Sequence, residues 1–208
     1  KEDDTAGAIS IGFVPTTLLT VLPIALGELH RRYPDLRVSV KSGLSGDLAE
    51  DVAAQKLDFA FLTAPDVPQK DLRLSVIADE PYAIISELGN PLPRNPYDLF
   101  LTHPFIAFSR QSWMGHQIEA HLAQAGVPFD PMIELDSIDA VENLVALGHG
   151  VSVVPTRTLA PRHPKLRYTA TSGDPAPLRR LMLAAHARSR RKTLRDVIVE
   201  IVKQSTEG

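Results

Sequence analysis

The 208 residues include 22 Lys and Arg and 25 Asp and Glu, a formal net charge of -3, and 44% of them are apolar. This length and apolar content suit one large domain or two lobes with a packed core. The net charge is not basic, as it would be for a typical nucleic-acid-binding domain, so we expect that this chain does not itself bind DNA or RNA. The absence of cysteine excludes disulfides, thiolate zinc sites and thiol catalysis. No apolar run approaches the ~20 residues that a membrane span needs.

The first third of the chain predicts alternating strands and helices. Ile9, Ile11 and Phe13 alternate as in a buried strand, and apolar residues from Leu18 to Tyr33 then recur at helical spacing. The pattern predicts strands at 8–13, 37–41 and 59–62 and helices at 17–33 and 46–54. Tyr33-Pro34 ends the first helix, because the residue before proline is pushed out of the helical region.

The same order recurs further along the chain. The pattern predicts strands at 105–108, 132–135 and 151–154 and helices at 113–125 and 138–147. Gly148 follows the last apolar positions of the second helix and is typical of a left-handed C-cap. Two β-α-β-α-β series favour parallel strands with crossover helices, and hence two lobes.

The connecting segments predict how the chain passes between the lobes. Strands are expected at 72–77 and 82–86, and the proline-rich loop 87–104 is the candidate for the crossing out of lobe I. Residues 155–169, with three prolines, are the candidate for the return. Strands at 166–171 and 179–185 and a helix at 192–204 then pack back on lobe I. We therefore expect lobe I at 7–86 plus 168–208 and an inserted lobe II at 87–167. The fold class is α/β, with two Rossmann-like lobes joined by a two-strand hinge that enclose a cleft.

Four strand-to-helix junctions are the candidate binding loops, because ligands of open α/β sheets bind beyond the carboxyl ends of the strands. They lie at 14–17, 43–47, 109–112 and 136–139, and each contains a hydroxyl residue. Ser and Thr there also suit simple helix capping. Hydroxyls of Thr16 and Thr17 and the amides of 43–46 could donate to a carboxylate. Arg110 could clamp a second carboxylate or reach solvent.

Enzyme and metal signatures are scarce. The chain contains no Gly-x-Gly-x-x-Gly, phosphate-binding loop, Gly-x-Ser-x-Gly or His-Glu-x-x-His motif. His116 and His121 are five residues apart, which places them on different faces of a helix. The dense basic run at 186–195 is interpreted as a solvated face. We therefore expect no enzyme, no cofactor and no metal.

Two segments resemble one known family, the effector-binding domain of LysR-type transcriptional regulators. The first is "GAISIGFVPTTLLTVLPIALGELHRRYPDLRVSVKSGLSGDLAEDVAAQKLDFAFL", which has the family's Gly before a strand, Ile-Gly, Leu-Pro, Tyr-Pro, Gly and Leu-Asp-x-Ala. In this chain these are Gly7, Ile11-Gly12, Leu22-Pro23, Tyr33-Pro34, Gly43 and Leu57-Asp58-Phe59-Ala60. The second, "NLVALGHGVSVVP" from Asn143 to Pro155, resembles the family's helix-Gly-x-Gly-strand-Pro segment.

The resemblance implies a fold like that of type II periplasmic binding proteins, with a small-molecule inducer in the interlobe cleft. The donor groups at the junctions favour an organic anion, such as a carboxylate, as this inducer. It also implies a winged helix-turn-helix before Lys1, through which the protein would bind DNA, a homodimer or homotetramer, and a cytoplasmic location. The inducer-contacting segments of the family fall on Pro15, Thr16, Thr17, Leu44, Ser45, Leu62, Phe108, Ser109 and Ser137. The family often has Ser or Thr where this chain has Pro15 and Leu44.

Three functions are compatible with these features. The first is the ligand-sensing domain of a bacterial transcription activator or repressor, in which inducer favours one arrangement of the lobes. Dimers of it would pair the helices at 17–33 and 117–125 across a two-fold axis. The second is a solute-binding protein of a transporter, which would share the lobes and the cleft. The third is a small α/β transferase or hydrolase, which would turn its ligand over.

Overall fold

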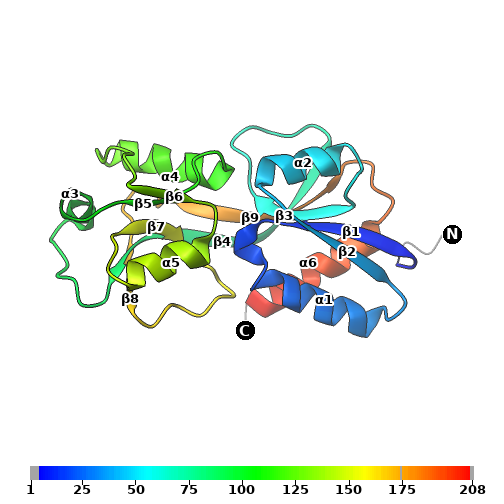
Figure 1. Ribbon diagram of the computed structural model, residues 1–208. Helices are drawn as coiled ribbons and strands as arrows, with labels where there is room; N and C mark the ends of the chain where they lie inside the picture. Colours follow the sequence, from blue (N-terminus) through cyan, green and yellow to red (C-terminus); the bar gives the residue numbers. More distant parts are fainter. Residues whose placement is uncertain (1–4, 174, 207–208) are drawn as a thin grey trace. The chain divides into compact units, whose positions relative to one another are not determined.

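The computed structural model describes residues 5–173 and 175–206 and divides into two compact units (Figure 1). Unit 1 holds the chain up to Asp79, the short segment Thr158–Ala160 and the chain from Arg180 on. Unit 2 holds Glu80–Arg157 and Pro161–Arg179. Each unit has its own core of buried side chains.

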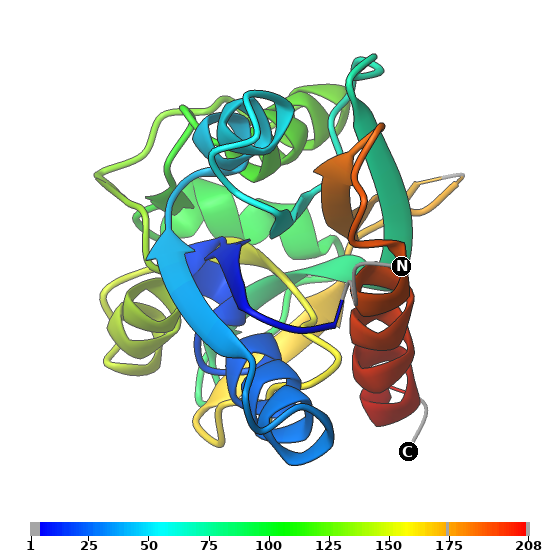
Figure 2. The same ribbon diagram turned by 90° about the vertical axis from the view of Figure 1, so that its right-hand side faces the viewer.

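Unit 1 is a sheet covered by helices on both faces (Figure 2). Its elements are β1 (Ala8–Phe13), the 3-10 turn η1 (Pro15–Thr17), α1 (Val21–Arg32), β2 (Arg37–Ser42), α2 (Ser45–Ala53), β3 (Phe59–Thr63), the first half of β4 (Leu72–Glu87), β9 (Leu178–His186) from Arg180 on and α6 (Lys192–Thr206). β1 lies between β2 and β3, parallel to both, and β9 runs antiparallel to β3.

Alternation along β1 decides which helix covers which face of this sheet. Ile9, Ile11 and Phe13 belong to the core that also holds the apolar residues of α1 and α6. Gly12 points the other way, toward α2, where a Cβ atom would lie 2.8 Å from Leu48 Cδ2. Gly12 therefore allows α2 to pack close to the sheet.

Unit 2 is a second α/β unit. It contains η2 (Pro96–Asp98), α3 (Leu99–Thr102), β5 (Ile106–Phe108), α4 (Trp113–Gln124), β6 (Ile133–Leu135), α5 (Ile138–Ala146), β7 (Ser152–Pro155), β8 (Leu166–Ala170) and the second half of β4. β5 pairs in parallel with β6, and a parallel bridge joins Phe105 to Val151. β4 pairs antiparallel with both β7 and β8 through residues 83–85, so it lies between them.

The predicted elements are confirmed within a few residues, with two exceptions. The helix expected at 17–33 begins only at Val21, because Pro15–Thr17 forms a separate 3-10 turn in which the Thr17 hydroxyl donates to the Val14 carbonyl. The two strands expected at 72–77 and 82–86 are one strand, β4. The C-cap prediction holds, since Gly148 has a φ of 78°.

The chain passes between the units at other places than the predicted ones. The boundaries lie at 79–80 on β4 and 179–180 on β9, instead of 86–87 and 167–168, and Thr158–Ala160 also groups with unit 1. The proline-rich loop 87–104 lies inside unit 2, where part of it folds as η2 and α3. Strand periodicity does not change where a strand exchanges one set of neighbours for another, so the sequence carried no signal of these positions. Residues 174 and 207–208 of the predicted lobe I lie outside the described residues.

A buried histidine on α4 belongs to the core of unit 2. The Nε2 atom of His121 lies 2.7 Å from the Tyr97 hydroxyl, and both side chains are more than nine-tenths buried. Burial lowers the pKa of His121, because the surroundings disfavour the imidazolium form.

Acidification should therefore destabilise this fold through His121. A histidine with a lowered pKa in the folded state binds its proton preferentially when unfolded, so its stabilising effect is lost as the pH falls below the ordinary value of about 6.5. We expect the free energy of unfolding, measured in urea at pH 7 and pH 5, to fall less in an H121Q variant than in the wild type. The exposed His116 provides the control, and an H116Q variant that flattened the pH dependence equally would contradict this assignment.

Candidate functional site

The carboxyl ends of three parallel strands meet at one edge of unit 1. Val14 N donates to Phe61 O at 3.1 Å, and Gly43 N donates to Phe13 O at 3.3 Å. These bonds bring together the loops that follow β1 and β2 and the end of β3 at Thr63. Because the strands are parallel and in register, the junctions at 14–17 and 43–47 are neighbours in space, as expected of parallel strands.

Four hydroxyl residues are buried at this edge, none more than 4% exposed: Thr16, Thr17, Ser45 and Thr63. Ser45 Oγ accepts a hydrogen bond from Thr63 N at 3.1 Å, which ties the start of α2 to the end of β3. Thr17 Oγ1 donates to Val14 O at 2.7 Å. The capping interpretation is thus wrong for these two junctions, since within the described residues no side chain caps α1 or α2.

Capping is the correct interpretation for the two junctions of unit 2. Ser112 Oγ accepts from Gly115 N at 2.9 Å at the start of α4, and Ser137 Oγ accepts from Ala140 N at 3.3 Å at the start of α5. Ser109 N donates to Leu135 O at 2.9 Å, so the loop after β5 is level with the end of β6. Ser109 and Ser137 are both half-buried.

Arg110 is already engaged by its own unit. Its side chain is 46% exposed, its Nε lies 3.3 Å from Glu134 Oε2, and its backbone N donates to Glu134 Oε1 at 2.9 Å. The guanidinium carbon also lies 4.8 Å from the centre of the Phe129 ring. The solvent-facing interpretation therefore describes the side chain as it stands, and a contact with ligand stays a prediction.

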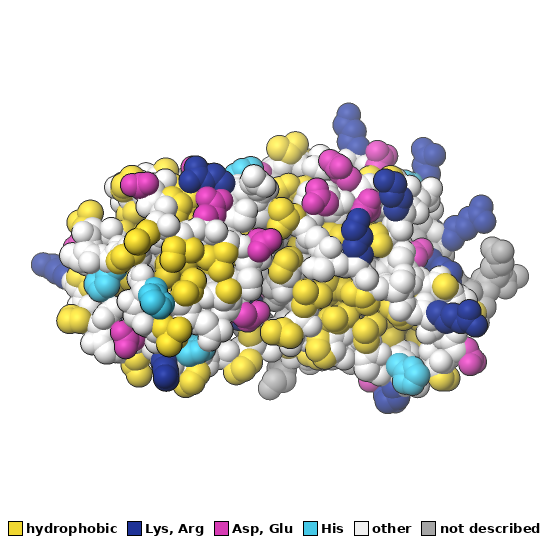
Figure 3. Space-filling model, viewed as in Figure 1, with side chains coloured by type: hydrophobic (Ala, Val, Ile, Leu, Met, Phe, Trp, Pro, Cys, Tyr) yellow, Lys and Arg dark blue, Asp and Glu magenta, His cyan; other side chains and the backbone are white. Residues whose placement is uncertain are grey.

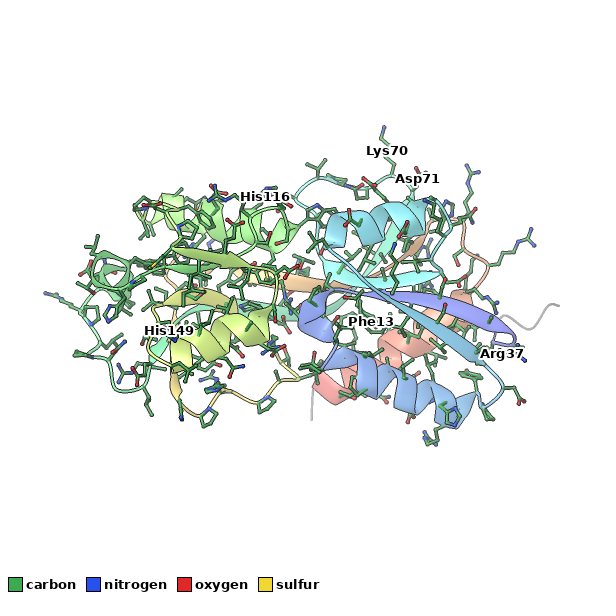
Figure 4. All side chains as sticks on the ribbon, viewed as in Figure 1. Phe13, Arg37, Lys70, Asp71, His116 and His149 are labelled. Atoms are coloured by element: carbon green, nitrogen blue, oxygen red, sulfur yellow. The ribbon has the colours of Figure 1, made fainter. Side chains whose placement is uncertain are left out.

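The remaining predicted residues are less accessible or apolar. Leu62 is fully buried and Phe108 is 4% exposed, whereas Pro15 and Leu44 are half-buried at the rim of the unit 1 edge. Phe13 lies at the end of β1 (Figure 4). Its ring stacks on that of Phe61 with ring centres 5.1 Å apart. Both phenylalanines belong to the core, as expected.

Two residues that shape these loops escaped the sequence analysis. Thr63 ends β3 and contributes both a backbone donor to Ser45 and a buried hydroxyl, but a single threonine at a strand end carries no distinctive pattern. Gly115 lies in the first turn of α4, where a Cβ atom would be 2.0 Å from Ser109 O. The available signal was a glycine inside an otherwise regular helix. Glycine lowers helix stability, so its presence there often indicates close packing against a neighbouring segment.

The described residues show neither a metal cluster nor a membrane span. No group of three or more His, Asp and Glu side chains in residues 5–173 and 175–206 is placed to hold a metal ion. His116 lies on α4 and His149 lies beyond the end of α5 (Figure 4). Within the same residues, every helix is too short or too polar to cross a bilayer.

Parallel β-α-β series and polar loops at the carboxyl ends of the strands define a mixed α/β fold like that of the type II periplasmic binding proteins. Solved regulatory domains with this fold match the chain almost throughout. Residues 2–206 match the family model described as "LysR substrate binding domain", and the chain belongs to this family.

The curated relatives are transcriptional regulators. The chain is 29% identical over 153 residues to the HTH-type transcriptional regulator CzcR of Bacillus subtilis, which covers 72% of this chain and 50% of the relative. It is 25% identical over 162 residues to the HTH-type transcriptional regulator SoxR of an Arthrobacter species, covering 76% and 52%. The chain therefore spans about half the length of the curated relatives it matches.

Solved structures of low sequence identity share the fold. A mutant of Corynebacterium glutamicum OxyR matches with a TM-score of 0.80 at 18% identity, covering 99% of this chain and 66% of the other. The effector-binding domain of a BenM variant matches with a TM-score of 0.80 at 19% identity, covering 96% and 94%. The CcmR regulatory domain of Synechocystis PCC6803, in complex with 2-PG, matches with a TM-score of 0.79 at 22% identity, covering 95% and 98%.

Proposed function

We propose that this chain is the effector-sensing domain of a LysR-type transcriptional regulator and that it binds a small organic anion, a carboxylate, at the polar loops of unit 1. The observation that carries the proposal is the gathering of four buried hydroxyl residues where three parallel strands end, beside the start of α2. Hydroxyl groups and helix-start amides that meet at one edge of a sheet are groups that can bind an anion, and this edge brings both kinds together.

The chemistry of this edge favours an anion. The first backbone N–H groups of a helix carry partial positive charge and have no partner within the helix. The N-cap residue of α2 is Leu44, whose side chain makes no capping hydrogen bond, and the Ser45 hydroxyl accepts a hydrogen bond from Thr63 N. A carboxylate can accept hydrogen bonds from helix-start amides and from hydroxyls together. The CcmR regulatory domain solved in complex with 2-PG supports a small-molecule effector for this fold.

The proposal is tested by a thermal-shift and calorimetric screen of small mono- and dicarboxylates against the chain. We expect at least one to raise the melting temperature, and a T16V variant to bind it about 10-fold more weakly, as for the loss of one hydrogen bond to a charged group. Thr16 is 3% exposed at the unit 1 edge, whereas Thr169 lies on β8 of unit 2. A T169V variant is therefore the matched control. Equal losses in the two variants would refute the site, and no stabiliser in a broad panel would refute carboxylate sensing.

Two other functions are less well supported. A solute-binding protein of a transporter would share the fold, but the curated relatives are transcriptional regulators. A transferase or hydrolase would convert its ligand, whereas we propose that a bound carboxylate is recovered unchanged from incubation with the chain, as mass spectrometry can show.

The proposed regulator acts as a dimer or tetramer in the cytoplasm and reaches DNA through a helix-turn-helix segment of the whole protein. Apolar side chains are exposed around η1 and the start of α1, where Leu19 is 72% exposed (Figure 3). Leu18 and Leu22 beside it are only partly buried. An apolar surface of this kind on a helix supports self-association through α1.

A further inference from the structure

Consecutive residues of β4 and β9 form two ion pairs at the positions where the chain passes between the units. Asp79 and Arg180, in unit 1, are joined by two hydrogen bonds of 2.7 and 3.0 Å, and both side chains are nearly half exposed. Glu80 and Arg179, in unit 2, are 3% and 1% exposed. Successive residues of a strand point to opposite faces, so the two pairs lie on opposite faces of β4 and β9.

The buried pair is fixed from both strands. Arg179 Nε donates to Glu80 Oε2 at 2.7 Å, and Nη2 donates to the same oxygen. Arg179 Nη1 contacts Met114 Sδ at 3.9 Å, in the first turn of α4. An ion pair this deeply buried is costly to desolvate, so it is not explained by stability alone.

One face of α4 contacts both β4 and β9, the strands on which the chain passes between the units. Met114 and Gln117 are three residues apart and therefore lie on the same side of the helix. Met114 contacts Arg179 on β9, and Gln117 Oε1 accepts a hydrogen bond from the Tyr82 hydroxyl on β4 at 3.1 Å. The other end of the same turn is held to the loop after β5, because Ser112 Oγ donates to Ser109 O at 2.7 Å and Gly115 leaves no room for a side chain there.

We propose that Arg179 and Glu80 are positioning residues that hold the first turn of α4, and with it the loop Ser109–Ser112, against the two strands on which the chain passes between the units. A displacement of this loop is then passed to β4 and β9 and is not absorbed in the loop. The proposal goes beyond the proposed function, which places the effector at the polar loops of unit 1.

The test is hydrogen–deuterium exchange, followed by mass spectrometry, on the ligand-free chain. The amides of Ser112, Gly115 and His116 are protected by hydrogen bonds within this turn, so they report its opening. In R179M we expect peptides that cover residues 109–117 to exchange about 10-fold faster, while peptides of α5 and β7 keep their rates. R180M, which breaks the exposed pair one residue along, is the matched control and should leave residues 109–117 within about 2-fold of the wild type.

A second variant separates positioning from stability. R179M alone leaves the Glu80 carboxylate buried without the guanidinium of Arg179. The double variant E80L/R179M is therefore compared with it, because two apolar side chains then replace the ion pair. We expect a melting temperature close to that of the wild type together with fast exchange at 109–117. Exchange at 109–117 that stays at the wild-type rate in E80L/R179M, or that rises evenly over all of unit 2, would overturn the proposal. Fast exchange at 109–117 in a chain that binds no carboxylate would refute the effector site alone and leave the positioning role standing.

Discussion

An Arg157→Met variant should lose about 3–5 kcal/mol of its free energy of unfolding, the cost of leaving a buried carboxylate without its partner. Arg157 Nη2 lies 2.8 Å from Glu142 Oε2 and 3.0 Å from Asp139 Oδ1, and its side chain is 6% exposed. The Tyr168 hydroxyl donates to the other oxygen of Glu142 at 3.3 Å. The cluster ties α5, which begins just after Ser137, to the segment that follows β7.

The pH dependence of this loss has a definite sign. Burial raises the pKa of Glu142, even though Arg157 acts in the opposite direction. Without Arg157 the pKa rises further, and the folded state then binds a proton more readily than the unfolded state. The variant is therefore relatively more stable at low pH, and the difference from the wild type should be larger at pH 8 than at pH 5.

Urea unfolding at the two pH values measures both effects. Arg110→Met is the control, because Arg110 pairs with Glu134 at a half-exposed position and should contribute less than about 1 kcal/mol. A loss in R157M no greater than in R110M, or a loss that grows on acidification, would show that the buried cluster is not the anchor of α5.

Gly115→Ala is expected to cost about 3 kcal/mol, at the upper end of the range for overpacking. The added methyl group would lie 2.0 Å from Ser109 O and 2.9 Å from the Cα atom of Arg110, and neither backbone atom can move without shifting the loop after β5. The change therefore acts on the start of α4 and on a predicted effector-contacting residue together.

A glycine-to-alanine change at a second position separates the effect of the steric clash on stability from the effect of helix propensity. Gly27 lies within α1, is exposed, and would place a Cβ atom with nothing within 4 Å. Gly27→Ala should therefore stabilise the chain by about 0.5–1 kcal/mol, since alanine is the better helix former. Thermal and urea unfolding of the two variants should thus move in opposite directions. A neutral Gly115→Ala would mean that α4 does not approach Ser109 as closely as described.

Much of the fold could be predicted because it depends on local periodicity. The alternation of Ile9, Ile11 and Phe13 and the helical spacing in α5 arise from burial on one side of an element, which any such element must satisfy. The family also follows from short motifs at fixed spacing. The start of α1 could not be predicted in the same way, because Pro15–Thr17 is held as a separate turn by hydrogen bonds and by its burial at the strand edge.

The location of the candidate site could likewise be predicted from the sequence, whereas the role of each hydroxyl residue in it could not. A hydroxyl residue at a strand-to-helix junction suits both a cap and a ligand, and the local sequence is equally compatible with each. Ser112 and Ser137 cap their helices, whereas Thr17 and Ser45 do not. For Ser45 the role of the hydroxyl is decided by a partner from another element, because it accepts a hydrogen bond from the amide of Thr63, eighteen residues away.

The amino-acid sequence by itself determined the β-α-β series, the family and the loops in which to look for a site, because these follow from spacing within short segments. Only the tertiary structure decided where β4 and β9 pass from one unit to the other, and that Glu80 and Arg179 meet there. It also decided that Pro15–Thr17 is a turn of its own beside Ser45 and Thr63. The physical reason is that these features depend on which distant residues become neighbours, and a buried charge or hydroxyl takes its role from the partner that it finds there.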